Sequence, residues 1–360
     1  MWWKATSISI FIVMVLLVIG ACGGGQEDAS IELSDRDRDL VEGAIEEGGV
    51  VYWSTIIQEE THEELAEAFR DRYGLPNDFE VEYSLLSTSD LVTRVDQELT
   101  ANQLTPDVVS VASLPWLYGL IEQGELMEYE SPSYENYGPA KEAGLTEEGY
   151  WVADGYTFLP MWNPEVIDVT IESWQDLNDP RFRGEVVAGD ADQSESYALT
   201  HLGLQQVLPQ SYFEGIAGLD PIFLVRSEDI AQRVAAEDYP IAYSGMPTRA
   251  YQWSERGVEL EVAYPEEGIV LLPQPFVIMQ DSTHPNAAML WIDFIFSEQG
   301  QTIYQENEAL MSGLEGFESP SAKYAPTISS VNAIPIDWQN VTESEIEEAR
   351  ENWSYMLGGH

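Results

Sequence analysis

Strand-like and helix-like segments alternate along most of this chain, and that alternation restricts its fold more than any other feature. Each strand-like segment is short and rich in β-branched and aromatic residues, and each helix-like segment places apolar residues at helical spacing. The strand and helix pairs expected in the first part of the chain are residues 50–55 with 65–73, 79–86 with 91–99, and 107–112 with 116–123. Such alternation indicates an α/β sheet with parallel neighbouring strands.

The middle of the chain contains two more units of the same kind. Residues 185–189 and 241–244 are predicted strands, followed by helices at about 196–207 and 248–257. Further helices are predicted late in the chain, and the last of them starts with a capping box in which Thr342 caps the helix and Glu345 reaches back. The two blocks of units predict two α/β lobes with a cleft between them.

The expected domain boundaries follow from this division. We expect lobe 1 to comprise residues 31–113 together with about 265–318. Lobe 2 is expected to comprise residues 114–264 together with about 319–360.

The N-terminal residues predict export and lipid attachment. Lys4 precedes an apolar stretch from Ile8 to Ile19, which is shorter than the ~20 residues that cross a bilayer and so indicates a signal peptide. The only cysteine, Cys22, follows it directly and resembles the lipid-modified cysteine of bacterial and archaeal lipoproteins. We therefore expect a signal peptide at residues 1–21, a lipid anchor at Cys22 and a flexible leash at residues 22–30. The alternative is a plain secreted protein with an incidental cysteine.

The chain is strongly acidic. Its 64 Asp and Glu residues face 15 Lys and Arg residues, for a formal net charge of −49. Self-repulsion of this size destabilises a compact state unless salt screens it, and the Debye length falls to ~3 Å near 1 M. The composition therefore favours a protein of a salt-adapted organism over an unusually acidic protein from an ordinary habitat. It excludes nucleic acid as a partner, but it does not exclude an anionic ligand in a local pocket.

Sequence motifs of catalysis are absent. The histidines at positions 62, 201, 284 and 360 are scattered, and no nucleophile elbow, phosphate loop or dinucleotide fingerprint occurs. With so many carboxylates, chance pairing is certain, so acid–base pairs cannot be argued from spacing. We expect no enzyme and no cofactor, and a secreted hydrolase on a two-domain scaffold is the alternative.

Hydroxyl residues recur where predicted strands end and helices begin. In open α/β sheets, ligands bind at these strand ends, where free N–H groups and hydroxyls converge. Each of these residues taken alone is most simply a helix cap, but their equivalent positions favour a shared cleft. The candidate ligand-binding residues of this kind are Ser54, Thr55, Thr88, Ser113, Ser194 and Ser196.

Three segments resemble bacterial extracellular solute-binding proteins. Residues 39–52 are similar to the opening of those proteins, residues 173–186 to a signature between their lobes, and residues 284–301 to their late helix pair. Within that family, the ferric-iron-type branch resembles this chain most. The resemblance implies a two-lobed type II periplasmic-binding-protein fold that closes on a small solute and hands it to the permease and ATPase of an ABC importer. It also implies a monomer that acts outside the cytoplasm, held at the membrane by the lipid anchor.

The same resemblance suggests further site residues. Iron-binding relatives carry adjacent tyrosines in a segment where this chain has Tyr243 and Tyr251 separated, so these are candidate Fe³⁺ ligands that depart from the family pattern. At the start of the middle helix this chain reads Ser194-Glu195-Ser196, and the carboxylate competes with an anion for the helix dipole unless it points to solvent.

Scarce positive charges and one further tyrosine complete the candidate site. Arg249 and Arg226 suit a carboxylate or a phosphate, or they form salt bridges within an acidic surface. Tyr156 lies in a strand-rich stretch near the expected cleft. From sequence the ligand stays open between Fe³⁺ and a small organic or phosphorylated solute.

Overall fold

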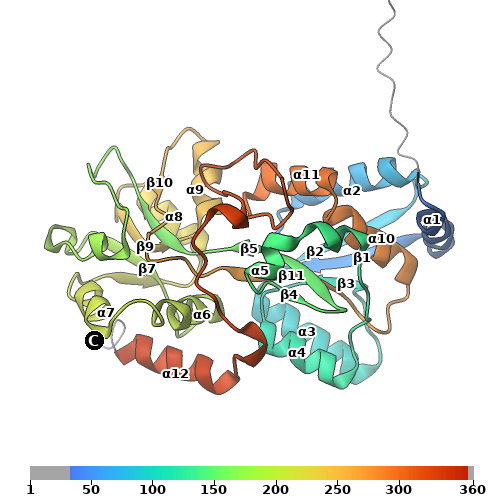
Figure 1. Cartoon of the computed structure of the whole chain (residues 1–360), viewed down its shortest axis with the longest axis horizontal. Helices are drawn as coiled ribbons and strands as arrows, with labels where there is room; N and C mark the ends of the chain where they lie inside the picture. The colour runs from blue at the N-terminus through green and yellow to red at the C-terminus, as the bar shows by residue number, and fades with distance from the viewer. Residues whose placement is uncertain (1–32, 356–360) are drawn as a thin grey trace, which may run out of the picture. The chain divides into compact units, whose positions relative to one another are not determined.

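The computed structural model describes residues 33–355, so the expected signal peptide, Cys22 and the leash lie outside the described residues. Two sheets, of six and five strands, organise this part of the chain (Figure 1). None of the described helices is long and apolar enough to cross a membrane.

The six-stranded sheet has the order β2-β1-β3-β11-β5-β4. Its strands are β1 (Gly49–Ser54), β2 (Glu80–Leu85), β3 (Val108–Ser110), β4 (Thr146–Glu147), β5 (Trp151–Tyr156) and β11 (Leu272–Ile278). β1 runs parallel to β2 and β3, whereas β11 runs antiparallel to β3 and β5. The expected strands of the first three units are confirmed, and so is their parallel pairing.

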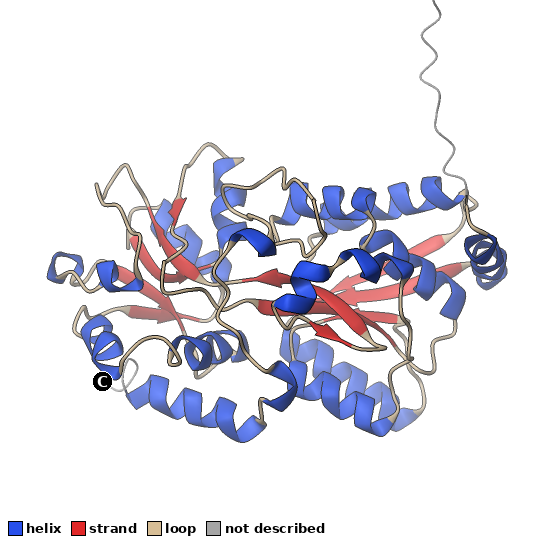
Figure 2. Ribbon diagram, viewed as in Figure 1, coloured by secondary structure: helices blue, strands red, loops and turns tan. Residues whose placement is uncertain are grey.

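Helices cover both faces of this sheet, with α3 and α4 on one face and α2, α10 and α11 on the other (Figure 2). The helices grouped with the six-stranded sheet are α1 (Asp35–Glu47), α2 (Glu59–Tyr73), α3 (Thr88–Ala101), α4 (Leu114–Gln123), α5 (Gly138–Glu142), α10 (Pro285–Ile295) and α11 (Glu298–Glu308). α4 shows the cause of the packing, because Leu114, Leu117 and Leu120 recur at helical spacing and are buried.

The five-stranded sheet has the order β10-β6-β9-β7-β8. Its strands are β6 (Leu159–Trp162), β7 (Val186–Gly189), β8 (Ile222–Leu224), β9 (Ile241–Gly245) and β10 (Glu261–Val262). The helices on this side are α6 (Glu195–Leu204), α7 (Gln210–Ala217), α8 (Ser227–Ala235), α9 (Pro247–Ser254) and α12 (Glu343–Trp353). β7 is parallel to β8 and β9, as the alternating pattern predicts.

The sheets divide the chain differently from the expected boundaries. β4 and β5 fall within residues 114–264, which we expected in lobe 2, yet both belong to the six-stranded sheet. The cause is the antiparallel pairing of β5 with β11, which joins Tyr156 to Leu272. The chain therefore crosses to the second sheet only after β5 and returns only after β10.

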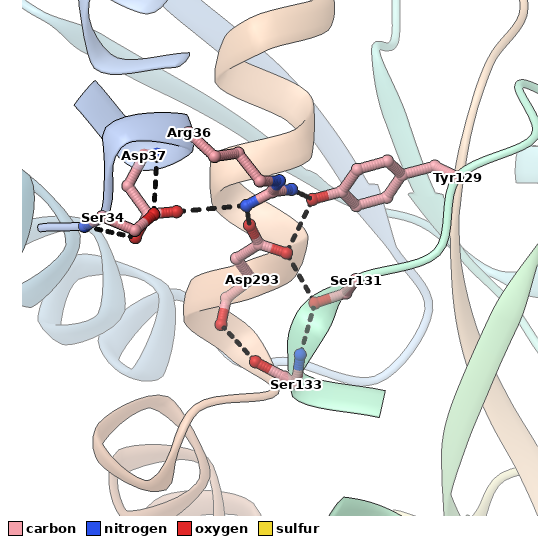
Figure 3. Close-up of polar contacts among 7 residues, drawn as sticks. All are labelled: Ser34, Arg36, Asp37, Tyr129, Ser131, Ser133 and Asp293. Atoms are coloured by element: carbon pink, nitrogen blue, oxygen red, sulfur yellow. Dashed lines mark hydrogen bonds and ion pairs between the residues drawn. The ribbon is translucent and has the colours of Figure 1, made fainter. Parts of the chain in front are cut away.

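A buried carboxylate links α1 to the other helices of the six-stranded sheet. Asp293 on α10 accepts hydrogen bonds from Arg36 Nη1 at 2.8 Å, from the Tyr129 hydroxyl at 2.7 Å and from Ser131 Oγ at 2.5 Å. Figure 3 shows these donors converging on Asp293, with Arg36 also bonded to the Tyr129 hydroxyl. The start of the described chain is thus held by charge as well as by apolar packing.

Candidate functional site

A cavity of about 400 Å³ lies between elements that belong to the two sheets. Its walls come from the starts of α3, α4 and α6, from the segment after β8, and from α12. Six hydroxyl side chains line it: Ser87, Thr88, Ser89, Ser113, Ser194 and Ser196. A larger hollow of about 640 Å³ is lined by Glu298, Glu315 and Glu318 and contains no residue of the five-stranded sheet's side. Of these two, the smaller cavity is the one lined by residues from both lobes, so we take it as the candidate site.

Two of the hydroxyl groups are not used to cap their own helices. Ser113 precedes α4 and Ser194 precedes α6, and neither side chain bonds its helix. Ser87 differs, because its Oγ accepts from the Asp90 amide at 3.2 Å, which is an ordinary N-cap. The hydroxyl of Ser194 is therefore available to the cavity, whereas that of Ser113 donates to Glu195.

Two helices start at the cavity and favour negative charge there. Thr88 and Ser89 are the first residues of α3, and Glu195 and Ser196 are the first residues of α6. The amide N–H groups of a first helical turn have no intrahelical partner, and the helix dipole adds a partial positive charge at the same end. Helix starts of this kind bind phosphate and carboxylate groups.

Two arginines add full positive charges to the cavity wall. Arg226 is 70% exposed, and its nearest carboxylate, Glu228, is 3.7 Å away. Arg350 on α12 lies 3.5 Å from Glu347, and its buried Nε has no hydrogen-bond partner among the described residues. Two of the 15 basic residues of a chain with 64 acidic ones therefore meet at one cavity, each with a carboxylate within 4 Å.

Glu195 is the one carboxylate in the lining of this cavity. It does not point to solvent, because its Oε1 accepts a hydrogen bond from Ser113 Oγ at 3.1 Å. Burial raises the pKa of Glu195 above its ordinary value, and the Ser113 hydrogen bond and the charge of Arg350 partly oppose that rise.

Tyr156 lies beside the cavity, at the point where the chain leaves β5 for the second sheet. Its hydroxyl and Ser196 Oγ are 3.0 Å apart, which links this crossover to the start of α6. Burial raises the pKa of Tyr156 to about 12, so its hydroxyl stays protonated at neutral pH. The structure thus brings Tyr156 together with Thr88, Ser113, Ser194 and Ser196.

Ser54 and Thr55 lie elsewhere, at the end of β1. Ser54 is buried, and its Oγ accepts from the amides of Ile56 at 3.2 Å and Ile57 at 3.4 Å, so it shapes a local turn. Thr55 Oγ1 accepts from Gln274 Nε2 at 3.4 Å. Neither residue lines the cavity.

The two candidate iron ligands also lie outside the cavity. Tyr243 is buried against Trp174 and Tyr212, with ring centroids 5.8 and 6.5 Å away, and burial raises the pKa of its phenol. Tyr251 donates its hydroxyl to the Glu306 carbonyl at 2.5 Å. Within residues 33–355 no group of three or more His, Cys, Asp or Glu side chains could hold a metal ion.

Arg249 is committed to internal contacts. It is 8% exposed, and its guanidinium contacts Glu228 at 2.5 Å, Ser227 at 3.2 Å and Gln252 at 2.9 Å. These contacts join α9 to the start of α8. Arg350 takes the place that we expected Arg249 to fill, and sequence reasoning missed it because it lies on the last helix, far along the chain from α6.

Comparison with known proteins identifies the family. The family of bacterial extracellular solute-binding proteins matches residues 104–328. This chain belongs to that family. No curated protein matches it.

Solved structures with the same fold are similar at low sequence identity. Iron-bound HitA from Pseudomonas aeruginosa is 19% identical, with a TM-score of 0.66 over 86% of this chain and 99% of that chain. AfuA from Actinobacillus pleuropneumoniae, with fructose 6-phosphate bound, is 19% identical, with a TM-score of 0.69 over 87% and 99%. The ferric iron-binding protein A from Mannheimia haemolytica, in an open conformation, is 15% identical, with a TM-score of 0.63 over 86% and 96%.

Family and fold together settle the class of function. The predicted two-lobed type II periplasmic-binding-protein fold is confirmed. The protein is a substrate-binding component of an ABC importer and acts outside the cytoplasm on a small solute. The family is one of binding proteins, which confirms the prediction that this chain is not an enzyme.

Proposed function

We propose that this protein captures a small organic anion, with a phosphate or carboxylate group, in the cavity between α3 and α6. The observation that carries this proposal is the convergence of two arginines and two helix starts on that cavity, in a chain of net charge −49. Each lobe supplies part of this environment, so only the closed form surrounds the solute.

Three kinds of contact favour an anion there. Arg226 and Arg350 offer charge-assisted hydrogen bonds, which are about twice as strong as neutral ones. The first turns of α3 and α6 offer free amides. The hydroxyl of Ser194 completes the donor set, because it is not spent on its own helix.

A phosphorylated solute is better supported than Fe³⁺. Hard trivalent iron needs several anionic oxygen ligands, and the phenols of Tyr243 and Tyr251 are respectively buried in the core and bonded to a carbonyl. Neither lines the cavity. The fructose 6-phosphate bound to AfuA is in keeping with this choice.

We further propose how the chain is divided and anchored. Lobe 1 contains residues 33–156 and the strand β11, and lobe 2 contains the five-stranded sheet with α12, so closure bends three crossovers, after β5, after β10 and between α11 and α12. A lipid on Cys22 would hold the monomer near its permease and raise the effective concentration of the captured solute there. Cys22→Ser is then expected to release the protein from the membrane fraction.

A ligand screen in concentrated salt tests the binding proposal. A ligand that binds the native state raises the melting temperature, since it stabilises that state by RT ln(1 + [L]/Kd). We expect a rise with fructose 6-phosphate or another organic phosphate or carboxylate, and none with Fe³⁺ alone. Arg350→Ala and Arg226→Ala should each weaken binding by about ten-fold or more. Arg233→Ala is the matched control, because Arg233 is a half-exposed arginine on α8 that pairs with Asp238. Stabilisation by Fe³⁺ that the cavity variants leave unchanged would overturn the proposal.

A further inference from the structure

Glu195 forms a direct hydrogen bond across the candidate cavity. It is the first residue of α6, on the side of the five-stranded sheet, and its Oε1 accepts from Ser113 Oγ at 3.1 Å. Ser113 follows β3 and precedes α4, on the side of the six-stranded sheet. A carboxylate of one lobe is thus paired with a hydroxyl of the other, inside a cavity whose remaining charged groups are arginines.

This arrangement is not the ordinary use of a Ser-Glu pair at a helix start. α11 also begins with such a pair, and there Ser297 Oγ accepts from the Gly300 amide at 3.2 Å while Glu298 is exposed. At α6, by contrast, Ser194 makes no cap and Glu195 turns into the cavity. The same two residue types are therefore used differently at the two helices.

The carboxylate restricts which anions the cavity accepts. A second negative charge beside Glu195 is repelled unless a hydrogen-bond donor satisfies the carboxylate oxygens, because a charge in a partly buried site is costly when unpaired. In the structure, that donor is the hydroxyl of Ser113. A solute that carries both an anionic group and a hydroxyl can supply the same kind of donor itself.

Resting on the function proposed above, we propose that Glu195 selects anions that carry a hydroxyl group close to the charge, such as a phosphate ester of a polyol or sugar. The ligand hydroxyl replaces that of Ser113 on Glu195, while Arg226, Arg350 and the helix starts hold the anionic group. Anions without a hydrogen-bond donor are rejected by the same carboxylate. Glu195 is therefore a specificity-determining residue.

Calorimetric titration of the whole mature protein with two probes tests this assignment. The probes are sulfate, which carries no donor hydrogen at neutral pH, and fructose 6-phosphate, which carries several. For the wild type we expect binding of fructose 6-phosphate and much weaker binding of sulfate. In Glu195→Gln, affinity for sulfate should rise about ten-fold and affinity for fructose 6-phosphate should fall about ten-fold, as a hydrogen bond to a charged group predicts. Glu298→Gln, the matched control on α11, should change neither.

A second variant separates selection from a structural role. Ser113→Ala removes the resident donor, so the ligand hydroxyl no longer competes with it and affinity for fructose 6-phosphate should rise several-fold. A purely structural Glu195–Ser113 contact predicts a loss in both variants instead. If all proteins bind the two probes with the wild-type ratio of affinities, the role of Glu195 is refuted and the anion site stands. If none of them binds either probe, the proposed function fails together with it.

Discussion

The Asp293 cluster gives a prediction whose size can be worked out from the structure. The Asp293 side chain is 9% exposed and accepts three side-chain hydrogen bonds, from Arg36, Tyr129 and Ser131. In Asp293→Asn, the amide nitrogen can only donate, so it faces at least one donor and the ionic pair with Arg36 is lost.

The expected loss in unfolding free energy follows from two contributions, the ion pair with Arg36 and the hydrogen bonds to Asp293. Breaking a fully buried ion pair costs about 3–5 kcal/mol, because the remaining charge is left unpaired. Here the Arg36 side chain is 38% exposed, so water solvates it in part and the cost is smaller. One or two weakened hydrogen bonds to a charged group cost about 1.5–3 kcal/mol each. We expect Asp293→Asn to lower the unfolding free energy by about 2–3 kcal/mol.

Urea unfolding in concentrated salt measures this loss. Arg36→Met removes the cation but leaves Asp293 paired with Tyr129 and Ser131, so its effect should be only about 1 kcal/mol. The double variant should be less destabilised than the sum of the two singles, since both break the same pair. A change below about 0.5 kcal/mol in Asp293→Asn, which is the size of an ordinary surface substitution, would show that the Asp293 cluster does not stabilise the fold.

Three further predictions follow from charge, burial and packing. Raising KCl from about 0.1 M to about 2 M should raise the melting temperature, because salt screens the repulsion of 64 acidic residues, and equal stability at both would refute salt adaptation. His201 is 3% exposed and burial lowers its pKa to about 4, so its contribution to stability is full above pH 6.5 and is lost as the pH falls towards 4. Between pH 6.5 and pH 4 the wild type should therefore lose roughly 3 kcal/mol of unfolding free energy through His201, and His201→Phe should not. An equal loss in both proteins would count against this effect of His201. A Cβ on Gly189 would lie 2.2 Å from the Tyr197 ring on α6, so Gly189→Ala should cost about 1–3 kcal/mol in urea and also weaken ligand binding. Gly119→Ala should do neither, because a Cβ there would meet only Gln123 Nε2, at 3.8 Å.

Local signals in the sequence predicted the elements well. The capping box of the last helix is confirmed, since Thr342 Oγ1 accepts from the Glu345 amide at 3.2 Å and the Glu345 carboxylate bonds the Thr342 amide. Strand and helix periodicity in the first three units also held. These signals depend on interactions within a few residues, so the packing of the rest of the chain does not alter them.

Contacts between segments far apart in the chain could not be predicted from such local signals. β5, which we expected in lobe 2, lies in the six-stranded sheet through its pairing with β11, more than a hundred residues later in the chain. Arg350 reaches the cavity only because α12 packs against α6. Tyr243 lies in a strand that is buried on both faces, so no alternation of polar and apolar residues marks which side chains reach the cleft.

A crystal structure grown with the organic anion that gives the largest rise in melting temperature would locate the binding site. We expect density for the anionic group at the starts of α3 and α6, within hydrogen-bond distance of Arg350 and of Ser194. An anion bound outside this cavity, or a metal ion held by Tyr251 with the cavity unchanged, would contradict the proposed function.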